Sequence, residues 1–203
     1  MLSLIVLAAG KSTRMRGKNK LLEHVNGTPM IRRVVQAALQ SKIDEVIVVL
    51  GWEASRVREV LADLPCNFVL NKEFESGQSS SVKAGLKAVS NATSALLILP
   101  GDVARVDSRS INMVIDAYNE TRSAIVVAGH SQEAGHPILF DKNLFHEIEQ
   151  INEQTYGLKS VVKQHESEVR FVEVGTANVL RDIDTPDDLK ELRNSDAPNS
   201  SRK

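Results

Sequence analysis

The sequence predicts an α/β protein with a doubly wound, mostly parallel sheet. Apolar runs rich in β-branched residues recur along the chain and alternate with amphipathic helical periods. Several of these runs are continuously apolar, which is typical of strands covered by helices on both faces. No internal repeat or low-complexity linker breaks the pattern. We therefore expect a single domain over residues 1–192, followed by a disordered polar tail at 193–203.

The individual elements follow from the same periodicities. Strands are expected at 2–8, 45–50, 66–70, 94–100, 124–129 and 169–175, and PILF at 137–140 adds another. Helices are expected at 29–40, 54–64, 79–89 and 109–119. A last helix begins at Thr185-Pro186, because proline suits the first helical turn. Thr185 and Asp187 are candidate caps for this helix.

Composition limits the possible partners. The chain has 203 residues, of which 42% are apolar and 25% charged, as in an ordinary globular protein. A net charge of -1 gives no basic field for nucleic acid or an anionic membrane, so we expect neither partner. No run approaches the ~20 apolar residues of a membrane span, and no targeting segment is recognised. We expect a cytoplasmic protein in which the single cysteine, Cys66, is a half-buried hydrophobe.

The segment AAGKSTR at 8–14 predicts a phosphate-binding loop. It follows the first strand, and ligands of such sheets bind beyond the carboxyl ends of the strands. Gly10 allows a turn and close approach to a ligand, and the next three backbone N–H groups can form an anion nest. Arg14 and Lys20 supply fixed positive charge for a triphosphate. The spacing is neither a Walker A motif nor GxGxxG, so a solvated glycine turn is the alternative.

Two further loops follow strands. In GDVARVD at 101–107, Asp102 stands directly after a strand, where a carboxylate can ligate Mg²⁺. A turn or helix-cap aspartate is the alternative. In NKEFESGQSSS at 71–81, Gly77 precedes three serines at a helix start. These serines can read the edges of a nucleobase, cap the helix, or do both.

Five blocks in order resemble the MobA-like nucleotidyltransferase superfamily, and within it the molybdenum cofactor cytidylyltransferase branch. The blocks are LAAGKSTRM at 7–15, GQSSSVKAGL at 77–86, LPGDVARVD at 99–107, GHPILF at 135–140 and DIDTPDDL at 182–189. The resemblance implies a Rossmann-like nucleotidyltransferase domain over 1–192. It also implies transfer of NMP from an NTP, with CTP favoured, to a small phosphorylated acceptor, with Mg²⁺ as cofactor and release of pyrophosphate. The implied acceptor is the molybdenum cofactor, with handover to a molybdoenzyme or its chaperone.

The resemblance also implies roles for individual residues. Lys20, Arg14 and Asp102 would be catalytic. The nucleotide would be bound by Leu7, Ala8, Ala9, Gly10, Lys11, Ser12, Gly77, Ser79, Ser80, Ser81 and Gly101. Asp102 would be the first metal ligand, and Asp184 or Asp182 the second. Asp184 is favoured because it is next to Thr185-Pro186, but the spacing does not decide between them, since residues two apart on an extended segment point to the same side. Ala9 favours cytosine, because guanylyl-transferring relatives tend to have glycine there. His136 would lie on the acceptor side or in a turn before the PILF strand.

The chain departs from the family pattern in the first loop and in a segment on the acceptor side. Arg16 is inserted before Gly17, so the first loop must bulge to keep Lys20 in reach. The stretch 152–164 retains only Gly157 from a GDxGxR-like segment that is associated with the acceptor in relatives. Other readings remain open. These are transfer to a sugar phosphate or another small phosphomonoester, a nucleotide-binding accessory protein without turnover, and an oxidoreductase.

Overall fold

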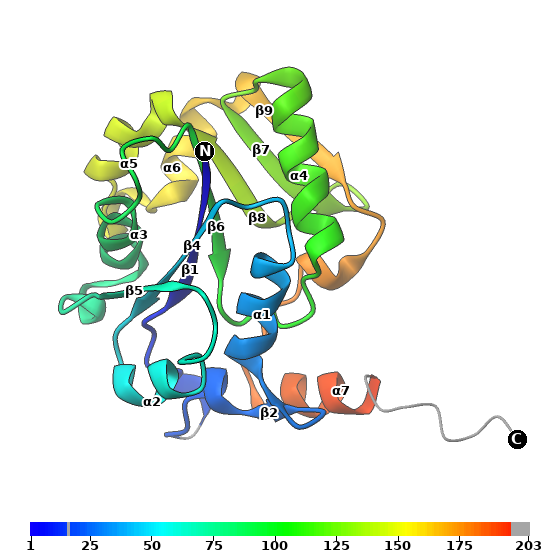
Figure 1. The fold of residues 1–203 in the computed structure, drawn as a ribbon. Helices are drawn as coiled ribbons and strands as arrows, with labels where there is room; N and C mark the ends of the chain where they lie inside the picture. The colour runs from blue at the N-terminus through cyan, green and yellow to red at the C-terminus, as the bar shows by residue number, and fades with distance from the viewer. Residues whose placement is uncertain (16, 196–203) are drawn as a thin grey trace, which may run out of the picture.

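The structure is a computed structural model that describes residues 1–15 and 17–195. Its core is a seven-stranded sheet in the order β5-β4-β1-β6-β8-β7-β9 (Figure 1). The strands are β1 (Leu2–Ala8), β4 (Glu45–Leu50), β5 (Asn67–Leu70), β6 (Ala95–Pro100), β7 (Ile125–His130), β8 (Glu133–Asp141) and β9 (Val169–Glu173). A separate antiparallel pair is formed by β2 (His24–Val25) and β3 (Thr28–Pro29). The predicted α/β class is confirmed.

Most neighbouring strands are parallel, as predicted, and β8 is the exception. At the centre, Ile5 of β1 lies opposite Ile47 of β4 and Ile98 of β6, both in parallel register. β8 runs antiparallel between β6 and β7. Ser131 and Gln132, with φ of 50° and 71°, form the two-residue connection from β7 to β8. Two successive positive φ values are typical of the tight hairpin turn that reverses a strand.

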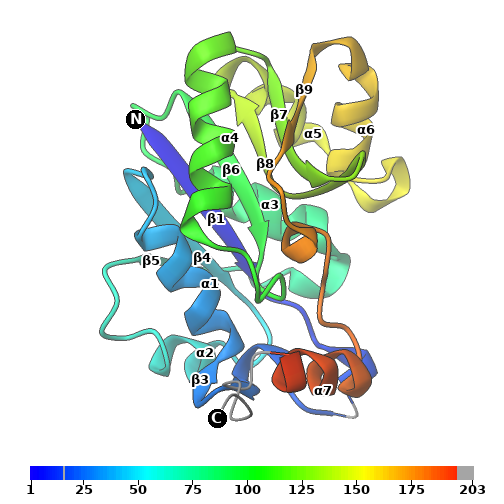
Figure 2. The same cartoon turned by 90° about the vertical axis from the view of Figure 1, so that its right-hand side faces the viewer.

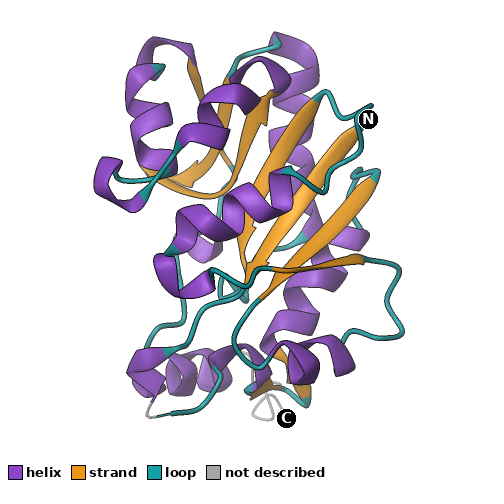
Figure 3. Cartoon of the chain, turned by 90° about the vertical axis from the view of Figure 1, so that its left-hand side faces the viewer, coloured by secondary structure: helices purple, strands orange, loops and turns teal. Residues whose placement is uncertain are grey.

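Helices cover both faces of the sheet, as the continuous apolar strands predicted. Their bounds are α1 (Met30–Leu39), α2 (Ala54–Glu59), α3 (Gln78–Leu86), α4 (Ser108–Thr121), α5 (Phe145–Gln150), α6 (Leu158–Gln164) and α7 (Pro186–Ser195). One apolar cluster packs α1, α2 and α4 on the first face through Val34, Val57 and Val114 (Figure 2). The second cluster packs α3, α5 and α6 on the other face (Figure 3). The helix predicted at 54–64 is shorter than expected, because the chain turns after Glu59 while Leu61 stays buried.

α3 lies unusually close to β1. A Cβ added at Gly85 would fall 2.6 Å from Cδ1 of Ile5, so a larger residue would push the helix away from the sheet. Backbone approach of this kind requires glycine. The glycine near the end of the GQSSSVKAGL block therefore has a packing role.

α7 closes the side of the molecule near β2. Leu189 and Leu192 pack with Met15 and Met30 in a third apolar cluster. The predicted tail at 193–203 is wrong for its first three residues, since α7 continues to Ser195. Within that stretch, the Arg193 guanidinium donates to the backbone oxygen of His24 at 2.8 Å. The rest of the predicted tail, 196–203, lies outside the described residues.

The structure bears on two expectations from composition, the burial of Cys66 and the lack of a membrane span. Cys66 is free and partly buried, and burial raises the pKa of its thiol. Among the described residues, no helix combines the length and the apolar character that crossing a bilayer requires.

Candidate functional site

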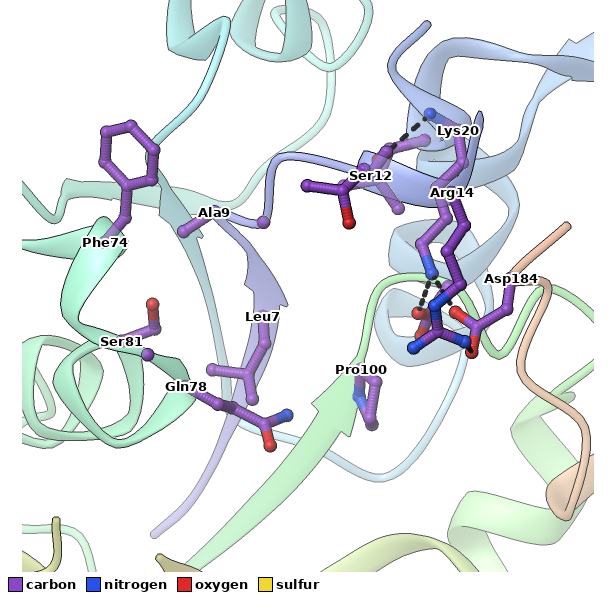
Figure 4. Close-up of a pocket in the computed structure, with 15 residues that line it drawn as sticks. Leu7, Ala9, Ser12, Arg14, Lys20, Phe74, Gln78, Ser81, Pro100 and Asp184 are labelled. Atoms are coloured by element: carbon purple, nitrogen blue, oxygen red, sulfur yellow. Dashed lines mark hydrogen bonds and ion pairs between the residues drawn. The ribbon is translucent and has the colours of Figure 1, made fainter. Parts of the chain in front are cut away.

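A pocket of about 330 Å³ lies where β1 and β6 end (Figure 4). Because these two strands are parallel neighbours, their carboxyl ends meet at one edge of the sheet. The loop after β1, the loop before α3 and the loop after β6 all contribute, as predicted from their positions in the sequence. The lining residues are Leu7, Ala9, Gly10, Ser12, Thr13, Arg14, Lys20, Leu21, Phe74, Gly77, Gln78, Ser81, Pro100, Asp102 and Asp184.

One side of the pocket, here called the charged wall, consists of Arg14, Lys20, Asp102 and Asp184. The Lys20 ammonium lies 2.6 Å from Oδ2 of Asp102 and 2.7 Å from Oδ1 of Asp184. Arg14 also pairs with Asp184. The sequence predicted all four residues, and the structure brings them together from three distant stretches of the chain.

Local hydrogen bonds position Lys20. It begins a short 3-10 turn, Lys20–Leu22, whose cap Asn19 accepts a hydrogen bond from the Leu21 N–H at 3.1 Å. The Lys20 N–H donates to Oγ of Ser12 at 3.2 Å, which ties this turn to the first loop. The inserted residue Arg16 lies outside the described residues, and Gly17 beside it has φ 81°.

The charges of this wall stabilise one another. Burial disfavours the Lys20 ammonium, but Asp102 and Asp184 outweigh that effect and raise its pKa. The hydrogen bond from Lys20 lowers the pKa of Asp184. Asp182 is exposed, yet desolvation of its carboxyl and the charges of Asp102 and Asp184 raise its pKa to about 6. Lys20 therefore remains charged, Asp184 loses its proton more readily than an ordinary aspartate, and Asp182 takes one up more readily.

The carboxylates of this wall fit a hard cation only in part. Oδ1 of Asp102 is buried and lacks a hydrogen-bond partner among the described residues, so it is a free acceptor. Asp184 lines the same pocket, whereas Asp182 lines a neighbouring one. Across residues 1–15 and 17–195, no group of three or more His, Cys, Asp or Glu is arranged to hold a metal ion. Asp102 and Asp184 are thus the donors that fit Mg²⁺ or a similar ion, with substrate oxygens completing its coordination.

The aspartate-rich block has a second, structural task. The hydroxyl of Thr185 accepts a hydrogen bond from the Asp188 N–H at 3.2 Å. Oδ2 of Asp188 accepts in return from the N–H groups of Thr185 at 2.7 Å and Asp184 at 3.0 Å. This reciprocal pattern is a capping box. Thr185 is a cap as predicted, but its partner is Asp188 rather than Asp187. The box fixes the backbone of Asp184 beside Lys20.

The opposite side, here called the neutral wall, consists of Phe74, Gly77, Gln78 and Ser81 (Figure 4). Nδ2 of Asn71 donates to the hydroxyl oxygens of Ser80 at 2.8 Å and Ser81 at 3.0 Å. The Ser80 hydroxyl donates to the Gly77 carbonyl at 2.8 Å, so it stabilises the helix start. Ser81 is the serine of this block that lines the pocket.

Several predicted nucleotide contacts do not line the pocket. Ser79 and Ser80 lie behind the neutral wall. Ala8 belongs to the first apolar cluster, on the face of the sheet that α1, α2 and α4 cover. Lys11 pairs with Glu75 at 2.5 Å. Gly101 is a packing position, since a Cβ there would lie 2.9 Å from the Leu7 carbonyl oxygen.

The turn of the first loop differs from the prediction. Gly10 has an ordinary φ, and its Cβ position is open space beside the pocket. The left-handed residue is Ser12, at φ 51°. Left-handed residues occur in the backbone shape of anion nests, so the nest remains a prediction with Ser12 at its centre.

His136 lies within β8, so the expected turn before the PILF strand is wrong. Pairing with β7 extends the strand to Glu133. The Nδ1 atom of His136 is buried and has no hydrogen-bond partner among the described residues. Burial lowers the pKa of His136 to about 4, so the ring is neutral. His136 does not line the pocket, and its acceptor-side role stays a prediction.

Four lining residues were not predicted from the sequence, namely Leu21, Phe74, Gln78 and Pro100. Phe74 and Pro100 are apolar, and residue type alone gave no reason to select them. Their only signal was position, because each lies in or next to a segment at the carboxyl end of a strand.

Comparison with known proteins shows the family of the chain. The model of the MobA-like NTP transferase domain matches residues 4–169. The bifunctional protein GlmU of Anaeromyxobacter sp. strain K is 30% identical over 204 residues, covering 90% of this chain and 41% of that protein. The chain spans 27–41% of the length of the curated relatives it matches first.

Solved structures share the fold over nearly the whole chain. Rv0371c of Mycobacterium tuberculosis superposes with a TM-score of 0.82 at 28% identity, covering 95% of this chain and 97% of that one. The same protein has been solved in complex with manganese. A nucleotidyl transferase from Methanothermobacter has a TM-score of 0.83 at 23% identity, covering 96% and 97% of the two chains, which supports the fold alone.

Proposed function

Because the chain belongs to the MobA-like NTP transferase family, we propose that it is a nucleotidyltransferase that moves CMP from CTP onto a phosphate-bearing acceptor and releases pyrophosphate. The observation that carries the proposal is the charged wall, in which Lys20 lies between Asp102 and Asp184 at the carboxyl ends of β1 and β6. This arrangement combines fixed positive charge for a triphosphate with carboxylates for a divalent cation.

The reaction needs positioning and charge rather than a covalent nucleophile. An oxygen of the acceptor phosphate attacks the α-phosphorus, a new P–O bond forms, and the bond between the α-phosphorus and the bridging oxygen breaks. Lys20 and Arg14 offset the negative charge that develops on the phosphates. Asp102 and Asp184 would hold a divalent cation, which neutralises phosphate charge when bound. His136 is neutral and contributes no charge to this step.

The identity of both substrates rests on the sequence resemblance. Ala9 lines the pocket and supports a pyrimidine donor, hence CTP. The motif blocks support the molybdenum cofactor as acceptor, cytoplasmic synthesis and handover of the product to a molybdoenzyme or its chaperone. The names of the relatives given above mention no such cofactor. A sugar phosphate or another small phosphomonoester is the alternative acceptor within the same reaction class.

The test is pyrophosphate release by the purified protein with each NTP in turn. Each reaction is run with Mg²⁺, with Mn²⁺ and with a chelator, and with molybdenum cofactor extract or hexose phosphates as acceptor. Release that needs CTP, metal and the extract, and that disappears in Asp102→Ala, supports the proposal. Release with a hexose phosphate instead replaces the acceptor. NTP binding without release under any condition shows an accessory protein without turnover.

A further inference from the structure

We infer that Glu153 is a positioning residue for the neutral wall, and that it sets the affinity of the pocket for the donor nucleotide from outside the pocket. This inference rests on the proposed function, since it concerns the same nucleotide site. Glu153 belongs to a 3-10 turn, Glu153–Thr155, that is far from the neutral wall in sequence.

The first observation is that α3 begins without a cap of its own. Its N-cap residue is Gly77, which has no side chain to accept hydrogen bonds from the first turn. Oε1 of Glu153 accepts a hydrogen bond from the Ser79 N–H at 2.6 Å. Ser79 is the second residue of the helix, where a cap side chain normally binds. Glu153 therefore caps α3 from another element, and its negative charge is favourable at a helix N-terminus.

The second observation is the tight fit around this contact. A Cβ added at Gly77 would fall 2.3 Å from Cγ of Glu153, and Gly77 has φ 110°. On the other side, a Cβ at Gly157 would lie 3.0 Å from the Ser79 hydroxyl oxygen. Glycines at these two positions let the two segments touch. The Gly77 of the sequence motif is thus explained by the approach of Glu153.

The third observation is that the segment carrying Glu153 is itself held in place. Oδ1 of Asn152 accepts from the Thr155 N–H at 3.0 Å, and its backbone oxygen accepts from the Gly157 N–H at 2.9 Å. The contacts of Gly157 and Glu153 with Ser79 both depend on the turn that these hydrogen bonds close. The closed turn therefore sets the position from which the Glu153 side chain reaches the Ser79 N–H.

The consequence concerns only one side of the pocket. Gly77, Gln78 and Ser81 lie on the turn that Glu153 holds, and all three line the pocket. Figure 4 places Gln78 and Ser81 across the pocket from Lys20 and Asp184. Loss of Glu153 should loosen the neutral wall and leave the charged wall intact. Nucleotide affinity should then fall while the rate of the bound complex stays the same.

The experiment compares Glu153→Ala with Glu153→Gln and with Gln154→Ala, a change at the next residue of the same exposed turn. Calorimetry gives the Kd for CTP, pyrophosphate release gives KM and kcat, and thermal unfolding shows that each variant is folded. We expect Glu153→Ala to raise Kd and KM about tenfold with kcat within about twofold. Glu153→Gln should recover most of the affinity, because its amide oxygen can accept from the Ser79 N–H. Gln154→Ala should match the wild type.

A second comparison uses the tight fit. Gly77→Ala should weaken binding more in the wild type than in the Glu153→Ala background, where the side chain that it would meet is gone. Equal Kd values for wild type and Glu153→Ala, or equal effects of Gly77→Ala in both backgrounds, would overturn the inference alone. Wild-type protein that binds no NTP would overturn the proposed function and this inference with it.

Discussion

The charged wall takes its side chains from three stretches of the chain, whereas the neutral wall comes from residues 74–81 alone. The two walls also differ in what holds their side chains in place. Lys20, Asp102 and Asp184 hold one another through their own ion pairs. The neutral wall depends on Asn71 behind it and on Glu153 from a distant turn. The side chains of the charged wall thus pair with one another, while the neutral wall is held by side chains from outside the pocket.

This contrast suggests a division of labour that experiments can break. If the charged wall stabilises the developing charge and the neutral wall binds the nucleotide, changes in the first should lower kcat and changes in the second should raise KM.

The largest expected effect is at Asp102. Asp102→Asn keeps the shape of the side chain but removes the charge that pairs with Lys20 and that would bind a cation. We expect kcat/KM for pyrophosphate release to fall by about 10³-fold or more, with the change in kcat. Asp187→Asn is the matched control, because Asp187 is an exposed aspartate outside the capping box. Retention of a tenth of the wild-type rate would contradict the assigned role of the charged wall.

The next effect is at Gln78, which lines the neutral wall. Gln78→Ala should raise the Kd for CTP by a factor of about 5 to 30, as expected for one lost polar contact, with little change in kcat. Isothermal titration and steady-state kinetics measure the two quantities. Lys83→Ala, on the same helix but outside the pocket lining, is the control. An equally large loss in kcat would contradict the assignment of nucleotide binding to the neutral wall and of charge stabilisation to the charged wall.

A smaller effect is expected in the scaffold at the end of the sheet away from the pocket. The buried Tyr118 hydroxyl donates to Oδ2 of Asp141 at 2.6 Å, linking α4 to the end of β8. Tyr118→Phe should lower the free energy of unfolding by about 1–2 kcal/mol in urea titrations and leave the Kd for CTP unchanged. Tyr156→Phe, at an exposed position, should change neither quantity. Weaker CTP binding in Tyr118→Phe would mean that the walls depend on this end of the sheet.

The smallest effect concerns pH. Hydrogen bonds to Glu168 and Glu147 raise the pKa of His165, which links α6 to α5 behind the turn that carries Glu153. A raised histidine pKa stabilises the fold fully below the ordinary value near 6.5, and this contribution is lost as pH rises through the folded pKa. His165→Gln should therefore cost on the order of 0.5 kcal/mol at pH 5.5 and nothing at pH 9. If the Kd for CTP changed with the same pH dependence, the contacts of His165 with Glu147 and Glu168 would also affect the neutral wall.

The sequence was informative where a residue type has one dominant use. Nearly continuous apolar runs located β1 and β4 to the residue, because strands covered on both faces are apolar along their whole length. Lys20 and Asp102 were identifiable from loops that follow strands, whereas Asp184 was identified only by the resemblance of the DIDTPDDL block to the family.

The remainder depended on contacts that no local pattern encodes. Ser79 looks like a ligand-binding serine in sequence, but its hydroxyl is buried beneath Gly157. The role of Glu153 arises only when two segments that are distant in sequence meet. The antiparallel course of β8 follows from a hairpin at Ser131-Gln132, a dipeptide without the glycine or asparagine that usually marks such turns.

Gly85 affects the shape of the site through the packing of α3 on the sheet. It lies near the far end of α3, yet it sets how closely the helix rests on Ile5 of β1. A nine-residue helix moves nearly as a rigid rod, so a bulkier residue there would shift Gly77, Gln78 and Ser81 outward together. Gly85 therefore sets the distance between the two walls, although it does not line the pocket. Altering the size of the accepted base is thus a problem of helix-to-sheet distance as much as of pocket chemistry.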